Sequence, residues 1–229
     1  MPSTGCEGTR AIVDHLRKDS KLTKLLLPNN GIGAPGVTAL ANFIHRSSTL
    51  TVLDISGNIH WDVQGSSTTE IAQALAQSSS LTHINLCSIG LADEQMKEMG
   101  SALFDRSETK KPASLCSLSC DVFAVEANSI KVEGRSQNSI GPGVFMLMAA
   151  VLISHESARE LIVQHQPLSA EGCIILARLL DTGCKTLERL DLRDIGLSKE
   201  HTGALAPTMH THNAHRPYSH STWSCRYRC

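Results

Sequence analysis

Residues 22–32 read LTKLLLPNNGI, and the pattern that they set, L-x-x-L-x-L-x-x-N-x-I, returns along the chain. It recurs at 50–58 (LTVLDISGN), 81–91 (LTHINLCSIGL), 158–168 (ARELIVQHQPL) and 187–197 (LERLDLRDIGL). Within each of the two runs, 22–91 and 158–197, consecutive copies start about 30 residues apart, and a period of this length is typical of proteins built from stacked supersecondary units.

Helical patterns follow every copy except the last, with apolar residues at the i, i+3, i+4 spacing of an amphipathic helix. One short strand and one helix cannot bury an apolar face alone, so the units are expected to stack as a parallel sheet covered by an outer helix layer. The predicted inward residues are Val37, Leu40, Ala41 and Ile44; Ile71, Ala74 and Leu75; Met96, Met99 and Leu103; Cys173, Leu176, Ala177 and Leu180; and, in a helix whose strand is less clear, Val144, Leu147, Met148 and Val151.

Because of these units, residues 10–206 resemble leucine-rich repeats of the ribonuclease-inhibitor-like class. That class includes ribonuclease inhibitor, the Ran GTPase-activating protein and the sensor arrays of NLR receptors. The resemblance implies an α/β horseshoe solenoid of about six repeats, with the parallel sheet on the concave face and the helices on the convex face. It also implies an asparagine at the ninth repeat position that hydrogen-bonds the backbone of the turn after the strand. That position holds Asn30, Asn58, Ile89, Gln166 and Ile195, so this ladder is expected to be partial.

The repeat pattern breaks between Leu103 and Val144, where two registers are open for the missing strand. One begins at Cys120 (CDVFAVEANSI, 120–130), and the other begins at Ala127 (ANSIKV, 127–132), one repeat length before Ala158. We prefer the second, because it leaves only two extra loop residues before the next helix. Residues 105–126 are then predicted to be an insertion, and residues 60–65 to lengthen the loop of the second repeat.

The two ends of the pattern are incomplete. Residues 11–16 are predicted to be the helix of a preceding half-repeat, and a helix starting near Thr202 is cut by Pro207. We therefore expect a solenoid domain over residues 1–206 and a disordered, His-rich tail over residues 207–229. No polar capping repeat is evident, which suggests a truncated or mis-spliced product.

The composition excludes several functional classes. The 21 Lys and Arg balance 22 Asp and Glu, whereas nucleic-acid binders and membrane-surface binders carry a basic excess. Aromatic residues make up only 3%, too few for base stacking. We find no signal peptide and no apolar run long enough for a membrane span. Since several of the eight cysteines occupy core-type positions, we expect a reduced, cytoplasmic protein.

Candidate chemistry is sparse. The tail residues His210, His212, His215, His220, Cys225 and Cys229 match no standard zinc-ligand spacing. Cys116 and Cys120 are expected to be inert or buried, and Cys87 to be a free thiol on the concave face. The glycines before the helices fit repeat loops better than a phosphate loop, since no Gly-Lys-Ser/Thr follows them. We predict no enzymatic activity, metal site, cofactor or small-molecule substrate.

The remaining functional surface is the sheet face turned away from the helices, where alternate strand residues point. We predict that this concave face binds a protein partner, without Trp or Tyr anchors. Its candidate contact residues are Lys24, Leu26, Asp54, Ser56, His83, Asn85, Glu160, Gln164, Arg189, Asp191 and Arg193.

Two alternatives come from the family resemblance alone. One is GTPase activation of the Ran GTPase-activating type, although no activating asparagine can be placed here and the acidic C-terminal tract of that family is absent. The other is the sensor fragment of an NLR-like receptor, although no nucleotide-binding segment is present.

Overall fold

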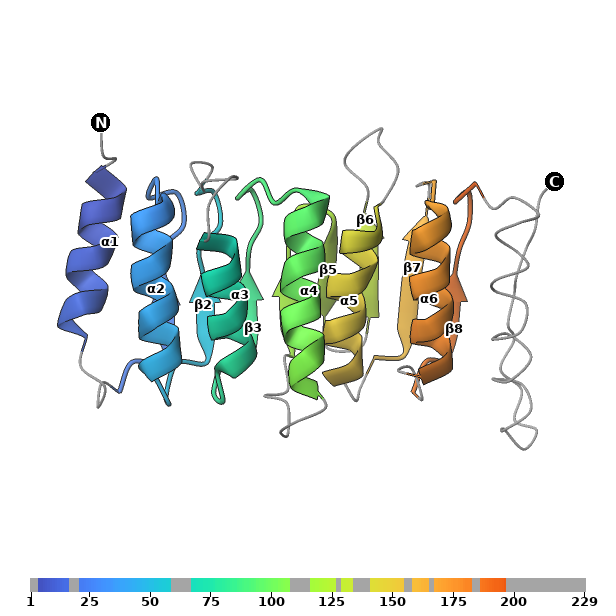
Figure 1. The fold of residues 1–229 in the computed structure, drawn as a ribbon. Coiled ribbons are helices and arrows are strands. Elements are labelled where there is room, and N and C mark those ends of the chain that lie inside the picture. Colours follow the sequence, from blue (N-terminus) through green and yellow to red (C-terminus); the bar gives the residue numbers. More distant parts are fainter. Residues whose placement is uncertain are drawn as a thin grey trace.

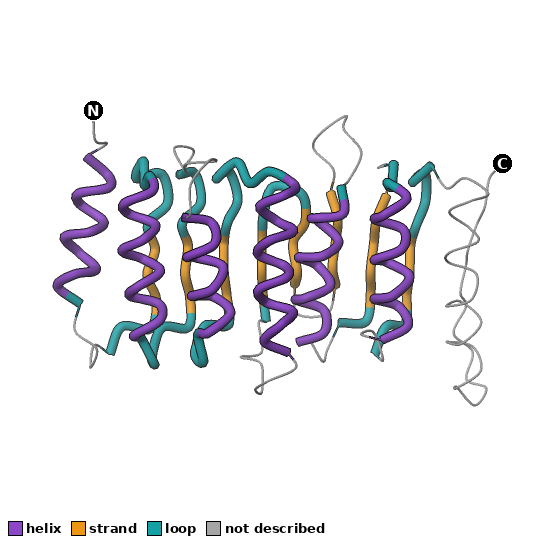
Figure 2. Tube along the Cα trace, in the orientation of Figure 1, coloured by secondary structure: helices purple, strands orange, loops and turns teal. Residues whose placement is uncertain are grey.

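The computed structural model describes residues 4–16, 21–58, 67–107, 116–126, 129–133, 141–154, 158–164, 167–182 and 186–196. One layer of helices stands in front of one layer of strands, in chain order from the N-terminal end (Figures 1 and 2). The helices are α1 (Thr4–His15), α2 (Ala34–Arg46), α3 (Ser67–Gln77), α4 (Asp93–Ser107), α5 (Pro142–Ser154) and α6 (Ala170–Thr182). The strands are β1 (Lys24–Leu26), β2 (Val52–Asp54), β3 (His83–Asn85), β4 (Ser117–Ser119), β5 (Phe123–Glu126), β6 (Ser129–Glu133), β7 (Glu160–Gln164) and β8 (Arg189–Asp191).

The eight strands form one sheet in the order β1 to β8. Successive repeats pair in register, so that Leu25 lies opposite Leu53 and Leu53 opposite Ile84. These pairs are parallel, as are β3–β4, β6–β7 and β7–β8. The predicted α/β arrangement, with a parallel sheet and an outer helix layer, is confirmed for these strands.

The predicted insertion at residues 105–126 is wrong in part, because two strands of the sheet lie in it. β4 continues the first parallel block, with Leu118 opposite Ile84. β5 then runs antiparallel to both β4 and β6, so the sheet is mixed where a purely parallel one was expected. The sequence signal was the half-pattern at 115–120 (LCSLSC), with cysteine at the third apolar position.

The strand before α5 is β6, in the register that we preferred. Ile130 lies opposite Leu161 and Val132 opposite Val163, as expected if Ala127 corresponds to Ala158. The other register also describes a real strand, because Phe123 and Val125 are buried within β5. The described residues between Leu103 and Val144 therefore form three strands, β4, β5 and β6, where we expected one.

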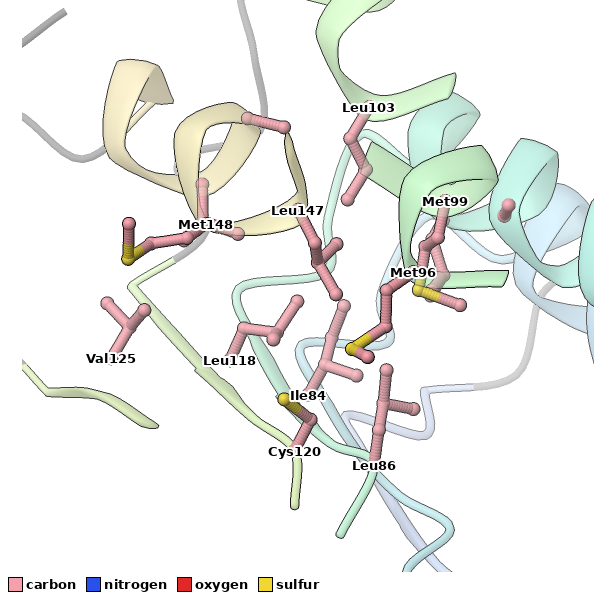
Figure 3. Packing of buried hydrophobic residues seen from close by; sticks show 14 of the residues in the cluster. Ile84, Leu86, Met96, Met99, Leu103, Leu118, Cys120, Val125, Leu147 and Met148 are labelled. Atoms are coloured by element: carbon pink, nitrogen blue, oxygen red, sulfur yellow. The ribbon is translucent and has the colours of Figure 1, made fainter. Parts of the chain in front are cut away.

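The core lies between the two layers, and every inward helix residue predicted from the sequence is buried. α5 is apolar on all sides and also fills the space above the β4–β5 hairpin. Leu147 and Met148 on α5 point toward Leu118 and Val125 of the hairpin, and Ile84, Met96 and Met99 complete this part of the core (Figure 3).

α5 is set back toward the sheet relative to its neighbours. Lys97 on α4 reaches Glu171 on α6 with 3.5 Å between Nζ and Oε1, although α5 lies between these helices in the chain. At Gly100 a Cβ would lie 2.6 Å from the Leu147 backbone nitrogen, so α4 and α5 touch through their backbones. The Asp93 carboxylate accepts hydrogen bonds from the backbone N–H groups of Gly143 (3.1 Å) and Val144 (3.3 Å). It thereby satisfies donors that the first turn of α5 leaves open.

A recurrent turn follows the parallel strands. Its eighth repeat position has positive φ in Asn29 (56°), Gly57 (70°), Ser88 (56°) and Asp194 (55°). Its tenth position is a glycine with positive φ in Gly31 (64°), Gly90 (75°) and Gly196 (65°). Short polar residues and glycine are the residues that tolerate this region. The turns after β1, β3 and β8 therefore share one conformation, although the asparagine of the ninth position is lost after β3 and β8.

The asparagine ladder is partial, as expected. Asn58 is fully buried, and its Oδ1 accepts the backbone N–H groups of Asn30 (2.9 Å) and Ile32 (3.0 Å) in the preceding turn. Its Nδ2 donates to the carbonyls of Leu27 (3.0 Å) and Ile55 (2.6 Å). One buried amide thus binds two consecutive repeats together.

Several predictions fall outside the described residues: the extended loop at 60–65, the helix near Thr202, the domain boundary at 206 and the tail at 207–229. Within the described part, the predicted half-repeat helix is α1, with Val13 buried. In that same part, no helix is both long and apolar enough to cross a membrane.

Candidate interaction face

The candidate site is the face of the sheet opposite the helices, called here the open face. Strand alternation places its residues: Leu25 is buried under the helices, whereas Lys24 and Leu26 on either side of it point outward. Leu26 is 59% exposed, although it is a large apolar residue. Figure 2 shows the described helices on the other side of the sheet.

The β2–β3 part of the open face carries a fixed polar cluster. Asp54 Oδ1 accepts hydrogen bonds from the backbone N–H (2.9 Å) and the hydroxyl (2.7 Å) of Ser56. Asp54 Oδ2 accepts from Asn85 Nδ2 at 3.2 Å, and Asn85 Oδ1 accepts the Cys87 N–H at 3.1 Å. The parallel register brings Asp54 and Asn85 opposite each other. Four of the predicted contact residues therefore lie close together on the open face: Asp54, Ser56, Asn85 and the exposed His83.

The β7–β8 part of the open face carries a cluster of opposite charges. Arg193 donates to both Asp191 oxygens, from Nε at 2.9 Å and from an Nη at 2.8 Å. Arg189 lies 3.5 Å from Glu160 Oε1 and 3.7 Å from Asp191 Oδ2. The hydrogen bond to Asp191, together with its charge, raises the pKa of Arg193 further. These two cations and two anions cancel in net charge, and Asp191 is itself buried at 9% exposure.

Gln164, the remaining predicted contact residue, is the last residue of β7 and lies opposite Glu133 of β6. Its side chain is outside the described residues.

Small residues missed by the sequence analysis lie beside the polar cluster. Since Leu118 is buried on β4, Ser117 and Ser119 face the open side, and Ala124 of β5 lies opposite Ser119. These three side chains are half-buried, and β6, whose side chains are outside the described residues, follows before the charged cluster. The half-pattern at 115–120 was the signal that could have placed the two serines.

Cysteine chemistry adds little to this face. Among the described residues, Cys87, Cys116, Cys120 and Cys173 form no disulfide, and Cys120 and Cys173 are buried as expected for small apolar residues. Burial raises the pKa of Cys120 to about 11, which disfavours the reactive thiolate. Cys116 is exposed. Among the described residues, no group of three or more potential metal ligands gathers.

A hollow of about 260 Å³ lies on the helix side, between α2 and α3. It is lined by Thr38, Ala41, Asn42, His45, Glu70, Gln73, Ala74 and Gln77. It is separate from the open face, and none of these residues is a Ser, Cys or Lys nucleophile.

Comparison with known proteins agrees with this architecture in one segment. A family model described as "Leucine Rich repeat" matches residues 18–41, which contain β1 and most of α2. None of the curated proteins matches the chain. The match supports a leucine-rich-repeat protein, and repeats of this kind suggest a protein-interaction module.

Proposed function

We propose that this leucine-rich-repeat chain holds a protein partner on the open face of its sheet. The observation that carries the proposal is that this face bears two side-chain clusters held in place by hydrogen bonds, while the described helices lie on the other side. Fixed side chains lose less conformational entropy when they bind. The open face is therefore better suited to binding a protein than to catalysing a reaction.

The chemistry of the face defines the partner. Asp54, Asn85 and His83 offer hydrogen-bonding groups at one end, and Arg189, Arg193 and Glu160 offer charges of both signs at the other. Beside the first cluster, the small side chains of Ser117 and Ser119 would let a partner backbone approach closely. The exposed ion pairs are worth little individually, and the described open face has no aromatic anchor. We therefore propose a protein partner with polar and charged contact groups, bound with modest affinity.

Three further features belong to this proposal. They are the concave, horseshoe curvature of about six ribonuclease-inhibitor-like repeats, the cytoplasmic location, and a role as a scaffold without cofactor or substrate. GTPase activation and the receptor-sensor role gain no separate support from the described residues.

Site-specific photocrosslinking tests the proposal. A benzophenone side chain at His83, on the open face, is expected to capture a distinct protein from cells that express the chain. The matched control places it at exposed Gln73 on α3, and the same product should be absent there.

The captured protein is then titrated against the purified chain. Arg189→Glu is expected to weaken binding about tenfold, as for a charged contact worth about 1.4 kcal/mol. Capture that is equal at both positions, or absent at His83, would refute the proposed face.

A further inference from the structure

Asn30 and Gly31 form the one pair in the sequence in which asparagine precedes glycine. Asparagine is a thermolabile residue, because the backbone nitrogen of the next residue can attack its side-chain carbonyl carbon. A glycine in that next position has no Cβ to obstruct the approach. Asn30 is exposed, so water can reach the reacting group and ammonia can leave. The pair therefore has the chemistry of a deamidation site.

The reaction at this pair needs water as its only co-reactant. The Gly31 nitrogen bonds to Asn30 Cγ, the Cγ–Nδ2 bond breaks, and the Gly31 proton leaves with the amide nitrogen as ammonia. Water then opens the cyclic imide on either side of its nitrogen. Opening at Cγ gives aspartate, whereas opening at the main-chain carbonyl gives isoaspartate, in which the backbone runs through Cγ. Both products carry a carboxylate in place of the amide, and isoaspartate also lengthens the backbone.

Hydrogen bonds to Asn58 hold the backbone on both sides of the attacking nitrogen. The N–H groups of Asn30 and Ile32 both donate to Asn58 Oδ1, at 2.9 and 3.0 Å. Asn58 is fully buried, so water does not compete for this acceptor. Ring closure has to turn the bonds that join Asn30 Cγ to the Gly31 nitrogen. The two hydrogen bonds resist that movement.

The start of α1 also packs on this pair. At Gly5 a Cβ would lie 1.6 Å from the Asn30 carbonyl oxygen and 3.0 Å from the Gly31 carbonyl carbon, so the backbone of α1 lies directly against the turn. The Asn30 side chain is held as well, because its Nδ2 donates to the Pro28 carbonyl at 2.8 Å. The turn therefore resists rearrangement while α1 and Asn58 stay in place.

Asn58 occupies the same ninth repeat position but lacks the features of a reactive site. It is followed by the β-branched Ile59 instead of glycine, and its Nδ2 donates to the carbonyls of Leu27 and Ile55. The two equivalent asparagines therefore differ in chemistry: Asn30 carries the reactive sequence, and Asn58 restrains it.

We infer that Asn30 is a deamidation site that the fold protects, and that it reacts when the first repeat opens locally. Local openings cost less free energy than global unfolding, so the reaction samples the turn and not the whole stack. The product is permanent, and a carboxylate at position 30 repels the Pro28 carbonyl, so each event leaves the first repeat less firmly attached. This inference is independent of the proposed function, because it concerns the turn and not the open face.

Peptide mass spectrometry of the purified full chain, incubated at neutral pH, tests the inference. Conversion of Asn30 raises the mass of its peptide, and Asn42 and Asn85 in the same digest serve as internal controls. We expect Asn30 to convert ahead of both controls in urea and more slowly in the folded chain. Asn58→Ala removes the acceptor for both N–H groups and should accelerate conversion in the folded chain at least about tenfold, a difference of about 1.4 kcal/mol.

Asp93→Ala is the matched control, because it destabilises the fold at α5 and leaves the turn of Asn30 unchanged, so the rate should stay at the wild-type level. Gly5→Ala keeps the test decisive if Asn58→Ala does not fold, since its Cβ displaces α1 from the Asn30 carbonyl and should also accelerate conversion. A folded wild-type chain that converts as fast as the chain in urea would overturn the inference. So would Asn58→Ala or Gly5→Ala, once shown to be folded by circular dichroism, if it converts at the wild-type rate or no faster than Asp93→Ala.

Discussion

Asn58 offers the sharpest test of how the repeats are held together. Replacing it with alanine removes an acceptor for the N–H groups of Asn30 and Ile32 and a donor to the carbonyls of Leu27 and Ile55. A buried polar group left without its partner costs about 1–3 kcal/mol. Asn30 is exposed, so water can replace its bond, whereas Ile32 is fully buried.

Asn58→Ala leaves three buried groups without their partner: the Ile32 N–H and the two carbonyls. Because water can reach them in part, we expect the free energy of unfolding to fall by about 3 kcal/mol. Urea denaturation followed by circular dichroism measures this loss. Hydrogen exchange should also show faster exchange at residues 27–32 than elsewhere, because the lost bonds lie there.

The control is Asn30→Ala, which removes one exposed hydrogen bond and should cost less than about 0.5 kcal/mol. A further variant, Asn58→Ile, places at this position the residue found at Ile89 and Ile195. It should remain destabilised, because its side chain fills the space without restoring the bonds. If Asn58→Ala costs no more than the Asn30→Ala control, the Asn58 amide does not hold the two repeats together.

Three other perturbations have defined outcomes. Asp93→Ala should cost about 1–2 kcal/mol, because the start of α5 loses its cap, as measured by urea denaturation. Gly57→Ala should destabilise slightly more than Gly90→Ala: both have positive φ, but only at Gly57 must a neighbour move, because the new Cβ would lie 2.0 Å from the Asn29 side-chain oxygen. Because burial raises the pKa of Cys120 to about 11, stability should be constant below the unfolded thiol pKa of about 8.5 and fall as pH rises from there toward 11. At pH 8, iodoacetamide should accordingly label Cys116 well before Cys120, as read by mass spectrometry.

Each of these has a contradicting result. Exposed Glu94 serves as the control for Asp93, and equal losses on replacing either by alanine would exclude the cap. Equal losses of stability at Gly57 and Gly90 would mean that the strain of positive φ alone causes the loss. Equal labelling of the two thiols in the folded chain, or a stability that does not change between pH 9 and 11, would contradict the burial of Cys120.

The repeating units were predictable because their signal is periodic and local. Leu53 and Ile71, for example, are placed by spacing alone, and both are buried. The β6 register was also within reach, since the distance from Ala127 to Ala158 equals a repeat length. The fold of these segments follows from which positions are apolar.

The β4–β5 hairpin was harder to predict, because its signals compete. Cys120 replaces the third apolar residue of the pattern, and the polar stretch before β4 favours a linker. Antiparallel pairing depends on contacts between strands, which a single-strand pattern does not encode. For the same reason the open-face residues could be named from alternation, whereas the Asp54–Asn85 bond and the Asp191–Arg193 pair required the register and the rotamers.

The hairpin also bears on how we expect the molecule to bend. Neighbouring strands usually lie about 4.8 Å apart and packed helices about 8–10 Å apart, so we expect an ordinary repeat to be wider on its helix side and to curve toward the sheet. Between α4 and α5 the helix layer is instead narrower than the strand layer. β3 and β6 are separated by three strand spacings, about 14 Å, while the two helices touch.

We propose that the stack, which we expect to bend toward the sheet within each parallel block, straightens where α4 and α5 touch. A partner that contacts both the polar cluster and the charged cluster would then have to be elongated or jointed.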